Sequence, residues 1–318
     1  MILRSPIATK VKFALYKLIG LSPAGARCLD IHLSRRAFRK AFGRDPDFSH
    51  PVLFGEKVTV RKLFDRRKIF RLMADKLWVR DFIIGKLGEP FVPKLYAVYR
   101  QFEEIDFDRL PNKFVIKPNH GTHWVLFVED KKTLDKAAAR RTVNGWMRTN
   151  YYVNSREIFY RDVKPRIMVE ELLEEASGKP VIDYKFFAFD GVTRFISATR
   201  RATVTADREA AIFDRAYREI PIQVEFANSV YKKERADNPE PAGETSTSRL
   251  SLPPNIDEMI KIADALAEGF DFIRVDLYSP GGRILVGELT SLPAGGVRPF
   301  EPPEYERQFG DYWKQVLS

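Results

Sequence analysis

Residues 272–296 read FIRVDLYSPGGRILVGELTSLPAGG, and this stretch decides the expected fold and site. It predicts two apolar strands joined by a tight Pro-Gly-Gly turn at 280–282. Asp276 interrupts the first strand and Glu288 interrupts the second. Two acids on adjacent antiparallel strands can face each other at a separation suited to Mg²⁺ or Mn²⁺, which prefer oxygen ligands and share them with phosphate. The alternative is an ordinary hairpin with two solvent-facing acids.

The first of these strands also carries a cation. Arg274 precedes Asp276 by two residues, so the strand pleat places both side chains on one face. A cation and two acids then converge at one point, as phosphoryl transfer requires.

Composition bounds the class of protein. The 318 residues can form one large or two medium domains with ample core. The single cysteine, Cys28, excludes an internal disulfide framework and a cysteine-based zinc site, and it favours the reducing cytoplasm. No apolar run is long enough to span a bilayer.

The net charge of +10 belongs to the N-terminal part of the chain. Residues 1–71 hold 17 Lys and Arg against 5 Asp and Glu, whereas the remainder is nearly neutral. Such an arm predicts an anionic partner: a membrane surface, a polyanionic polymer such as a polysaccharide, or nucleic acid. Nucleic acid is the least favoured of these, because the sequence has no helix-turn-helix, zinc module or RNP motif.

The first 26 residues imitate a signal peptide, but Lys17 breaks their apolar patch. We favour a basic amphipathic helix over about residues 10–20 that rests on an apolar or acidic surface. This places the protein in the cytoplasm, with peripheral attachment to the inner face of the membrane as an option. A helix packed on its own domain is the alternative.

Short helices alternate with mostly antiparallel hairpins, which is typical of an α+β fold rather than a doubly wound parallel sheet. We expect helices within 1–50, 58–88, 130–148, 256–269 and 302–317. We expect strands at 91–99, 111–121 and 166–174, a hairpin at 183–200 that turns at Asp190-Gly191, and a loop at 234–254.

A second candidate site lies where the strand at 111–121 ends. Lys117 closes the apolar run and begins a turn, where a lysine is placed to meet phosphate oxygens. The backbone N–H groups around Gly121 can cradle the same anion. His120 and His123 are further candidates for contact with phosphate or substrate. The alternative is a common strand-end lysine followed by solvated histidines.

The strand at 166–174 ends in two acids and two leucines: Glu170, Glu171, Leu172 and Leu173. Unpaired backbone groups at such an edge can bond an adenine ring, and Glu174 or Glu175 can take ribose hydroxyls. The alternative is a charged loop after a strand.

The hairpin at 183–200 adds three cations. Lys185 lies among aromatic residues and either points outward or enters a cleft. Arg200 and Arg201 lie at the end of the next strand and could hold a carboxylate bidentately.

Taken in this order, the segments resemble the ATP-grasp superfamily from about residue 62 to residue 310. The matching segments are VIKPNHG (115–121), RIMVEELLE (166–174), DYKFFAFDG (183–191) and RVDLY…GRILVGELTSLPAGG (274–296). The last is similar to the metal-binding strand pair of D-alanine–D-alanine ligase and its relatives. The DYKFF, RVD and GELT elements resemble the TupA-like branch more closely. That branch is associated with bacterial cell-surface polysaccharide synthesis, including the attachment of amino acids to uronic-acid polymers.

The resemblance implies two α+β subdomains that clasp ATP. They would span residues 61–165, with the phosphate-binding loop, and 166–318, with the metal site. A basic helical region at 1–60 would precede them.

The resemblance also implies roles for the phosphate and adenine contacts. Lys117 and Lys185 would hold the phosphates, and the turn at 119–124, which includes His120, Gly121 and Thr122, would close over them. The backbone at 171–173, beside Glu170, would meet adenine, with Glu174 or Glu175 near the ribose.

For the metal, the resemblance implies that Asp276 and Glu288 carry one or two Mg²⁺ ions, with Mn²⁺ as an option. Thr290 stands where the wider superfamily usually has Asn, which makes it a weaker neutral ligand. Arg274 would stabilise the transferring phosphoryl group, with Lys185 and Arg200 as the other catalytic candidates.

The implied reaction is an ATP-dependent carboxylate–amine ligation. A carboxylate, from a uronic acid or an amino acid, would attack the γ-phosphate to form an acyl phosphate, and an amine would then displace phosphate. Two alternatives remain: an ATP-grasp kinase that phosphorylates a hydroxyl, and a non-enzymatic polyanion-binding protein that uses the basic arm.

Overall fold

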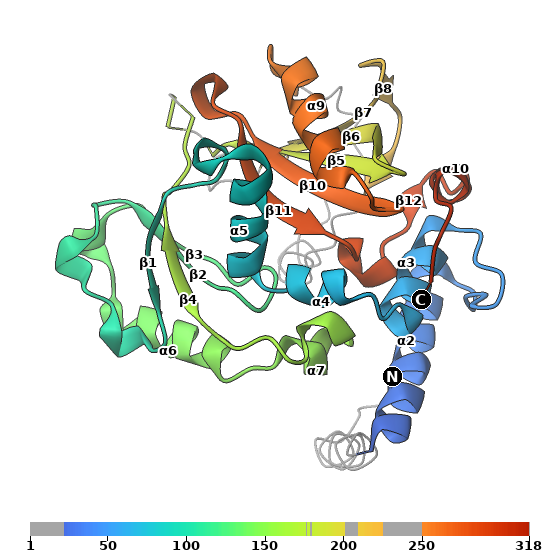
Figure 1. The fold of residues 1–318 in the computed structure, drawn as a ribbon, viewed down its shortest axis with the longest axis horizontal. Coiled ribbons are helices and arrows are strands. Elements are labelled where there is room, and N and C mark those ends of the chain that lie inside the picture. Colours follow the sequence, from blue (N-terminus) through green and yellow to red (C-terminus); the bar gives the residue numbers. More distant parts are fainter. Residues whose placement is uncertain (1–21, 176, 179, 201–208, 225–249, 318) are drawn as a thin grey trace, which may run out of the picture.

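The computed structural model describes residues 22–175, 177–178, 180–200, 209–224 and 250–317 (Figure 1). The amphipathic helix predicted at 10–20 and most of the loop predicted at 234–254 lie outside these residues, and so does Arg201.

Helices and strands occur in separate runs along the described chain, which is typical of the expected α+β class. The helices are α2 (Pro23–Phe42), α3 (Phe54–Phe64), α4 (Lys68–Met73), α5 (Lys76–Leu87), α6 (Lys136–Met147), α7 (Tyr151–Ser155), α9 (Ile256–Ala267) and α10 (Glu304–Tyr312). The strands are β1 (Leu95–Tyr99), β2 (Phe114–Pro118), β3 (Leu126–Val128), β4 (Ile167–Glu170), β5 (Ile182–Phe189), β6 (Val192–Arg200), β7 (Glu209–Asp214), β8 (Glu219–Ile220), β9 (Gln223–Val224), β10 (Phe272–Tyr278), β11 (Leu285–Thr290) and β12 (Phe300–Glu301). Short 3₁₀ turns lie between them: η1 (Glu89–Phe91), η2 (Phe102–Glu104), η3 (Phe107–Arg109), η4 (Lys131–Thr133), η5 (Ile158–Tyr160), η6 (Pro280–Gly282) and η7 (Pro293–Gly296).

Two antiparallel sheets stand side by side with helix α5 between them (Figure 1). The first has the order β1-β4-β2-β3 and the second the order β11-β10-β5-β6-β7-β8, while β12 and β9 form a separate pair. Strand β4 pairs with β1 and β2, so hydrogen bonding joins it to the first sheet. The predicted boundary at 165/166 cuts this strand away from its partners. The division into subdomains otherwise stays a prediction.

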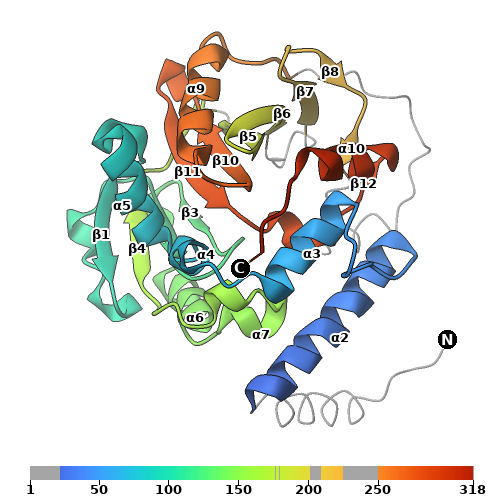
Figure 2. The same ribbon diagram turned by 45° about the vertical axis from the view of Figure 1, so that its right-hand side comes forward.

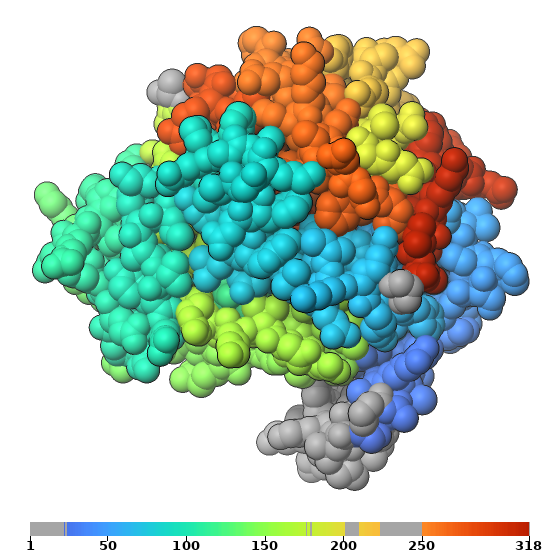
Figure 3. All heavy atoms as spheres, viewed as in Figure 1, coloured from blue at the N-terminus to red at the C-terminus, as the bar shows by residue number. Residues whose placement is uncertain are grey.

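The helix predicted over 58–88 is wrong in one respect, because the segment forms three helices. Asp65 ends α3 and accepts hydrogen bonds from the backbone and guanidinium of Arg67. Asp75 caps α5 by accepting from the Leu77 N–H. Asp side chains that accept hydrogen bonds from the backbone favour helix ends over helix interiors. Asp65 and Asp75 therefore each interrupt the predicted helix. In the space-filling view α3, α4 and α5 form a band across the face between the two sheets (Figure 3).

Each sheet has its own hydrophobic core. In the first sheet, Phe114 and Ile116 of β2 pack with Val143 of α6. In the second, α9 covers one face, where it contacts β5, β6 and β10. Helices α3 and α10 lie on the other side of that sheet, and α2 runs along α3 beyond it (Figure 2).

One face of the second sheet changes from aromatic to charged along its strands. Phe272 pairs with Phe189, and both rings contact Phe54 of α3. Two residues further on, Arg274 pairs with Phe187, and after two more Asp276 pairs with Lys185. Because alternate residues of a strand share a face, the charged residues continue the surface that the phenylalanines begin. The aromatic end is covered by helices, and the charged end faces the first sheet.

A buried guanidinium anchors the start of β10. Arg61 of α3 is completely buried, and it donates to Asp271 Oδ1 at 2.6 Å and to the Phe272 carbonyl at 2.8 Å. Its guanidinium also lies over the rings of Phe70 and Trp313, at 4.5 and 4.3 Å from their centroids. Burying an ion pair is tolerated only where hydrogen bonds and geometry offset the loss of water.

Replacing this guanidinium should therefore destabilise the fold strongly. We expect Arg61→Met to lower the free energy of unfolding by about 3–5 kcal/mol, because it leaves Asp271 buried with a smaller set of partners. Equilibrium urea denaturation measures this loss.

The matched control is Arg39→Met, which removes a solvent-exposed ion pair with Asp45. Exposed pairs contribute little, so this variant should unfold almost as the wild type does. Equal losses in the two variants would contradict the role given to Arg61.

Candidate active site

The charged face of the second sheet brings five predicted site residues together. Asp276 of β10 lies directly opposite Glu288 of β11 and, on its other side, opposite Lys185 of β5. Arg274 lies opposite Thr290 in the neighbouring row. The predicted hairpin and its turn at 280–282 are thus confirmed as elements, and the two acids share one face.

Arg274 contacts three of the other residues on this face. Its guanidinium donates to both oxygens of Asp276 at 2.6 Å and to the Thr290 hydroxyl at 3.0 Å, and it lies 3.8 Å from Glu288. Such bidentate geometry fixes the planes of both groups. The Asp276 side chain is only 6% exposed, so the arrangement is rigid and shielded from water.

The two acids differ in their pKa values. Burial raises the pKa of Asp276 to about 6, although Arg274 opposes the shift. Burial also opposes the ionisation of Glu288, but Lys76, Arg274 and Lys117 outweigh it and hold its pKa below the usual range. Glu288 is therefore a carboxylate at neutral pH, surrounded by cations from both sheets.

Two lysines approach from the side of the first sheet. Lys117 of β2 forms an ion pair with Glu170 of β4 at 2.5 Å. Lys76, the first residue of α5, lies 3.8 Å from Glu288 and donates to the Gly121 carbonyl. Burial lowers the pKa of Lys76, with Lys117 adding to the shift and Glu288 opposing it.

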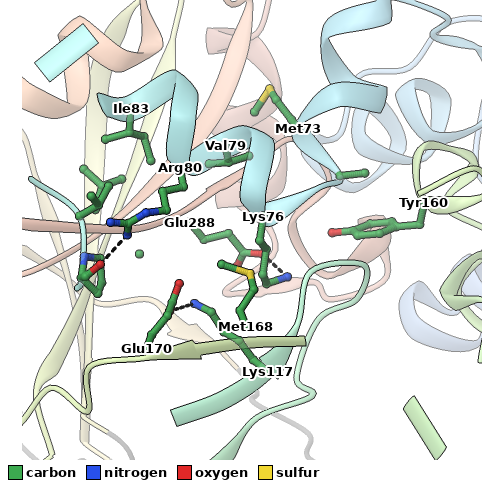
Figure 4. A pocket seen from close by; sticks show the side chains of 15 residues that line it. Met73, Lys76, Val79, Arg80, Ile83, Lys117, Tyr160, Met168, Glu170 and Glu288 are labelled. Atoms are coloured by element: carbon green, nitrogen blue, oxygen red, sulfur yellow. Dashed lines mark hydrogen bonds and ion pairs between the residues drawn. The ribbon is translucent and has the colours of Figure 1, made fainter. Parts of the chain in front are cut away.

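These lysines border a small pocket (Figure 4). The pocket lies between α5, the first sheet and β11, and Tyr160 closes one end. Its apolar lining is Met73, Ala74, Val79, Ile83, Val92, Pro93, Met168 and Val286. This mixture of an apolar wall with a few converging charges is typical of a small-molecule site.

The turn after β2 is held by its own side chains. Gly121 has no room for a side chain, because a Cβ there would lie 2.5 Å from the Trp124 ring. Thr122 shares a 2.5 Å hydrogen bond with the Tyr151 hydroxyl. His120 is buried against Trp146, whose carbonyl lies 3.3 Å from its Nε2, whereas His123 is exposed. The backbone of this turn, rather than His120, is therefore what a ligand can reach.

The acids that follow β4 are spread out. Glu171 bonds Arg283 of the hairpin at 2.9 Å, and Glu174 bonds Lys113 at 2.7 Å. Leu172 and Leu173 are half-buried, lie outside the strand, and are absent from the pocket lining that the described residues form. Their adenine and ribose roles stay predictions.

Lys185 and Arg200 lie on different faces of the second sheet. Lys185 pairs with Asp276 and contacts Asp183 on the charged face. Arg200 lies opposite Ile182 of β5. Ile182 and Lys185 are an odd number of positions apart, so the pleat places Ile182, and Arg200 with it, on the face opposite to that of Lys185. The structure therefore brings Lys185, but not Arg200, to the acids.

The donor set fits Mg²⁺. Asp276 and Glu288 offer carboxylate oxygens on one face, with the Thr290 hydroxyl beside them. Within the described ranges no group of three or more His, Cys, Asp and Glu is arranged to hold a metal. Magnesium commonly takes only one or two protein carboxylates and completes its shell with phosphate and water. Two acids and a hydroxyl are thus a fitting, though incomplete, set.

Sequence reasoning missed Lys76, Tyr160 and Arg298. Lys76 does not stand out in the sequence because the pattern over 58–88 predicts a single helix. The signal for a new helix is Asp75, a residue type that favours the N-cap, directly before Lys76. Arg298 follows β11 and lies near Arg274: burial lowers its pKa, and the positive charge of Arg274 lowers it further. No pattern in the sequence indicates that Tyr160 approaches Glu288 or that Arg298 approaches Arg274.

Comparison with known proteins gives one extensive match. The family model described as TupA-like ATPgrasp matches residues 56–314. None of the curated proteins matches the chain significantly. No helix of the described part of the chain is long and apolar enough to cross a membrane.

Several solved structures are distantly similar. The D-alanine–D-alanine ligase from Bacillus anthracis complexed with ATP is 17% identical with a TM-score of 0.41, and the match covers 70% of this chain and 55% of that one. The D-alanine–D-alanine ligase from Helicobacter pylori is 12% identical with a TM-score of 0.41, covering 82% and 69%. The ATP-grasp ligase PsnB complexed with minimal precursor is 12% identical with a TM-score of 0.39, covering 78% and 62%. This chain thus spans about half the length of the Bacillus anthracis ligase.

The family match carries the conclusion. It begins in α3, includes both sheets and the pocket between them, and ends after α10. The chain belongs to the TupA-like ATP-grasp family and has the ATP-grasp fold.

Proposed function

We propose that this protein is an ATP-dependent carboxylate–amine ligase that works through an acyl phosphate. The observation that carries the proposal is that Lys76, Lys117 and Arg274 surround Glu288, with Asp276 opposite it, at the edge of an apolar pocket. Membership of the family supports it.

In this proposal ATP lies in the pocket between the sheets. The apolar wall that includes Met168 and Val286 takes the base, and Lys76 and Lys117 take the phosphates. Lysine ammonium groups are compact charges suited to phosphate oxygens. The ion pair of Lys117 with Glu170 holds its side chain in place before the nucleotide binds.

Asp276, Glu288 and Thr290 would hold Mg²⁺, which supplies positive charge to the phosphate oxygens. Arg274 neutralises Asp276 through two hydrogen bonds, and metal binding to Asp276 would free its guanidinium for a phosphoryl group. It would then stabilise the charge that develops on the transferred group. Burial raises the pKa of Asp276, and the positive charge of a bound Mg²⁺ would oppose this shift.

The chemistry consists of two displacements. A carboxylate oxygen of the substrate forms a bond to the γ-phosphorus as the bond to ADP breaks, which leaves an acyl phosphate. The nitrogen of an amine then forms a bond to the acyl carbon, and phosphate leaves with its bonding electron pair. A site shielded from water protects the acyl phosphate between these steps.

For the substrates, we propose a uronic-acid-containing cell-surface polysaccharide or its precursor and an amino acid. The support is the resemblance to the TupA-like branch, together with Lys185 opposite Asp276 and Arg298 near Arg274, which suit an anionic substrate. We further propose a cytoplasmic location, in which the basic N-terminal region meets an anionic membrane surface or the polysaccharide itself.

A nucleophile trap tests the ligase proposal. The purified protein with Mg-ATP, galacturonic or glucuronic acid, and hydroxylamine should form a hydroxamate, because hydroxylamine captures acyl phosphates. Replacing hydroxylamine by an amino acid should give an amide, ADP and phosphate in equal amounts, measured by mass spectrometry. A stable phosphorylated sugar that forms without any amine would contradict the proposal and identify a kinase.

The role given to Lys76 can be tested by itself. Lys76→Met removes a buried ammonium from the phosphate end of the pocket, so we expect ATP affinity to fall about 10–100-fold, as for the loss of a charge-assisted hydrogen bond. Calorimetric titration with a non-hydrolysable ATP analogue and Mg²⁺ measures the change.

Helix α5 supplies a matched control in Lys86→Met. Lys86 lies in the last turn of the same helix and contacts Ala265 and Glu268. Its removal should leave ATP affinity unchanged. Similar affinities for the wild type and Lys76→Met, or an equal loss in both variants, would contradict the assignment.

A further inference from the structure

Glu157 differs from every other buried acid that the structure describes. Its residue is 9% exposed, yet no described residue donates a hydrogen bond to its carboxylate or lies within ion-pair distance of it. The other buried acids have such partners: Asp30 with Tyr152, Glu56 with Arg44, Asp65 with Arg67, Glu170 with Lys117, Asp271 with Arg61, Asp276 with Arg274, and Glu306 with the N–H groups of Gly55 and Phe300. An unpaired carboxylate that is largely removed from water is costly, so this position favours a ligand.

The nearest lysine is already committed elsewhere. Lys62 of α3 is 4% exposed and donates to the Gly295 carbonyl at 2.9 Å. A Cβ on Gly295 would lie 3.8 Å from Lys62 Nζ and 3.7 Å from Glu157 Oε1. Both side chains therefore border the same turn, η7, which follows the strand of Glu288. Lys62 compensates part of the charge of Glu157 at longer range without bonding it.

Glu157 also belongs to the surroundings of the active site. It precedes η5, the turn that ends in Tyr160, and Tyr160 lines the ATP pocket with Lys76 and Glu288. Burial raises the pKa of Tyr151 to about 12, and the charges of Glu157 and Glu288 add to this shift. The hydroxyl of Tyr151 is therefore within electrostatic range of both acids.

Aromatic rings complete this corner of the site. The Tyr151 and Tyr160 centroids lie 4.8 Å apart in an edge-on arrangement, and Trp124 stands 5.4 Å from Tyr151. Ring faces attract ammonium groups, and they do so more strongly where water is excluded. A buried carboxylate without a bonded cation, beside such rings, is the chemistry that recognises a protonated amine.

We propose that Glu157, with Tyr151 and Tyr160, binds the amino group of the nitrogen-donating substrate. The inference rests on the proposed ligase function and assigns the second substrate to a definite side of the site. The ligand class is a primary ammonium, such as the α-amino group of an amino acid. The pocket with Lys76 and Lys117 serves ATP, and the η5–η7 side serves the amine.

The same residue can accept the proton that the amine must lose. Burial raises the pKa of Glu157 to about 7, Glu288 adds to the shift, and Lys62 opposes it. One proton passes from the ammonium to Glu157, and the freed lone pair forms the C–N bond as the acyl C–O bond to phosphate breaks. The second nitrogen proton leaves with the phosphate, so charge and atoms balance.

The direct test uses methylammonium as a probe in the intact chain. With methylammonium chloride in place of sodium chloride at equal ionic strength, the thermal midpoint of the wild type should rise by about 1–2 °C once the probe exceeds its Kd several-fold. Glu157→Gln should lose this rise. Glu103→Gln, at an exposed acid paired with Arg140, should retain it.

Two results would overturn the proposal. One is the absence of a methylammonium effect in the wild type. The other is an equal rise in the wild type and Glu157→Gln, which would mean that Glu157 only balances the charge of Lys62. The methylammonium measurement does not depend on ATP or on the identity of the carboxylate substrate. A negative result is therefore distinct from a failure of the ligase proposal.

A second measurement separates amine binding from the first displacement. Hydroxylamine is uncharged at neutral pH and needs no carboxylate to bind it. In Glu157→Gln the ratio of amide to hydroxamate should fall about tenfold or more, with a raised KM for the amine. An unchanged ratio would contradict the assignment. If the wild type forms no hydroxamate, the ligase proposal fails, and the methylammonium arm alone decides the fate of the ammonium site.

Discussion

The buried pair of Arg61 and Asp271 fixes the strand on which the site depends. Asp271 directly precedes β10, and Arg61 also bonds the carbonyl of Phe272, the first residue of that strand. Strand β10 lies between β5 and β11, so its position sets the register of both neighbours. Arg274 and Asp276 follow at the next alternate positions, and they reach the charged face because the strand begins where Arg61 holds it.

The site concentrates charges that a sequence optimised only for stability would avoid. Lys117 disfavours the charge of Lys76, and Arg274 disfavours the charge of Arg298. Asp276 is buried far enough for its pKa to rise to about 6. Cations gathered around a few carboxylates repel one another, and the binding of a polyanion such as a nucleoside triphosphate relieves this repulsion. The charges that ligand binding requires therefore make this region less favourable for folding in the absence of a ligand.

Much of the fold could be predicted because local signals agreed with the tertiary structure. The alternating apolar pattern and the Pro-Gly-Gly turn specified the β10–β11 hairpin, and Asp190-Gly191 specified the turn between β5 and β6. Acid and cation two residues apart on one strand share a face by geometry alone, which is why Arg274 and Asp276 were found. The ATP-grasp fold followed from the order of these segments rather than from any one of them.

The remaining features depended on contacts between distant segments. Lys76 meets Glu288 only because α5 lies between the sheets, and Glu157 meets η7 only through tertiary packing. The face of Arg200 depends on strand register, which the sequence did not define. The break between α3, α4 and α5 depends on Asp65 and Asp75, whose side chains bond backbone groups instead of continuing a helix.

The central claim is that Asp276 and Glu288 bind a metal together with ATP, and the thermal midpoint tests it most directly. The wild type and Asp276→Asn should be melted with Mg²⁺ alone, with ATP alone and with both. We expect a large rise in the wild type only with both, because ligand binding to the native state stabilises it by mass action. In Asp276→Asn the combined rise should fall to that of ATP alone. An equal combined rise in the two proteins, or none in the wild type, would contradict the account.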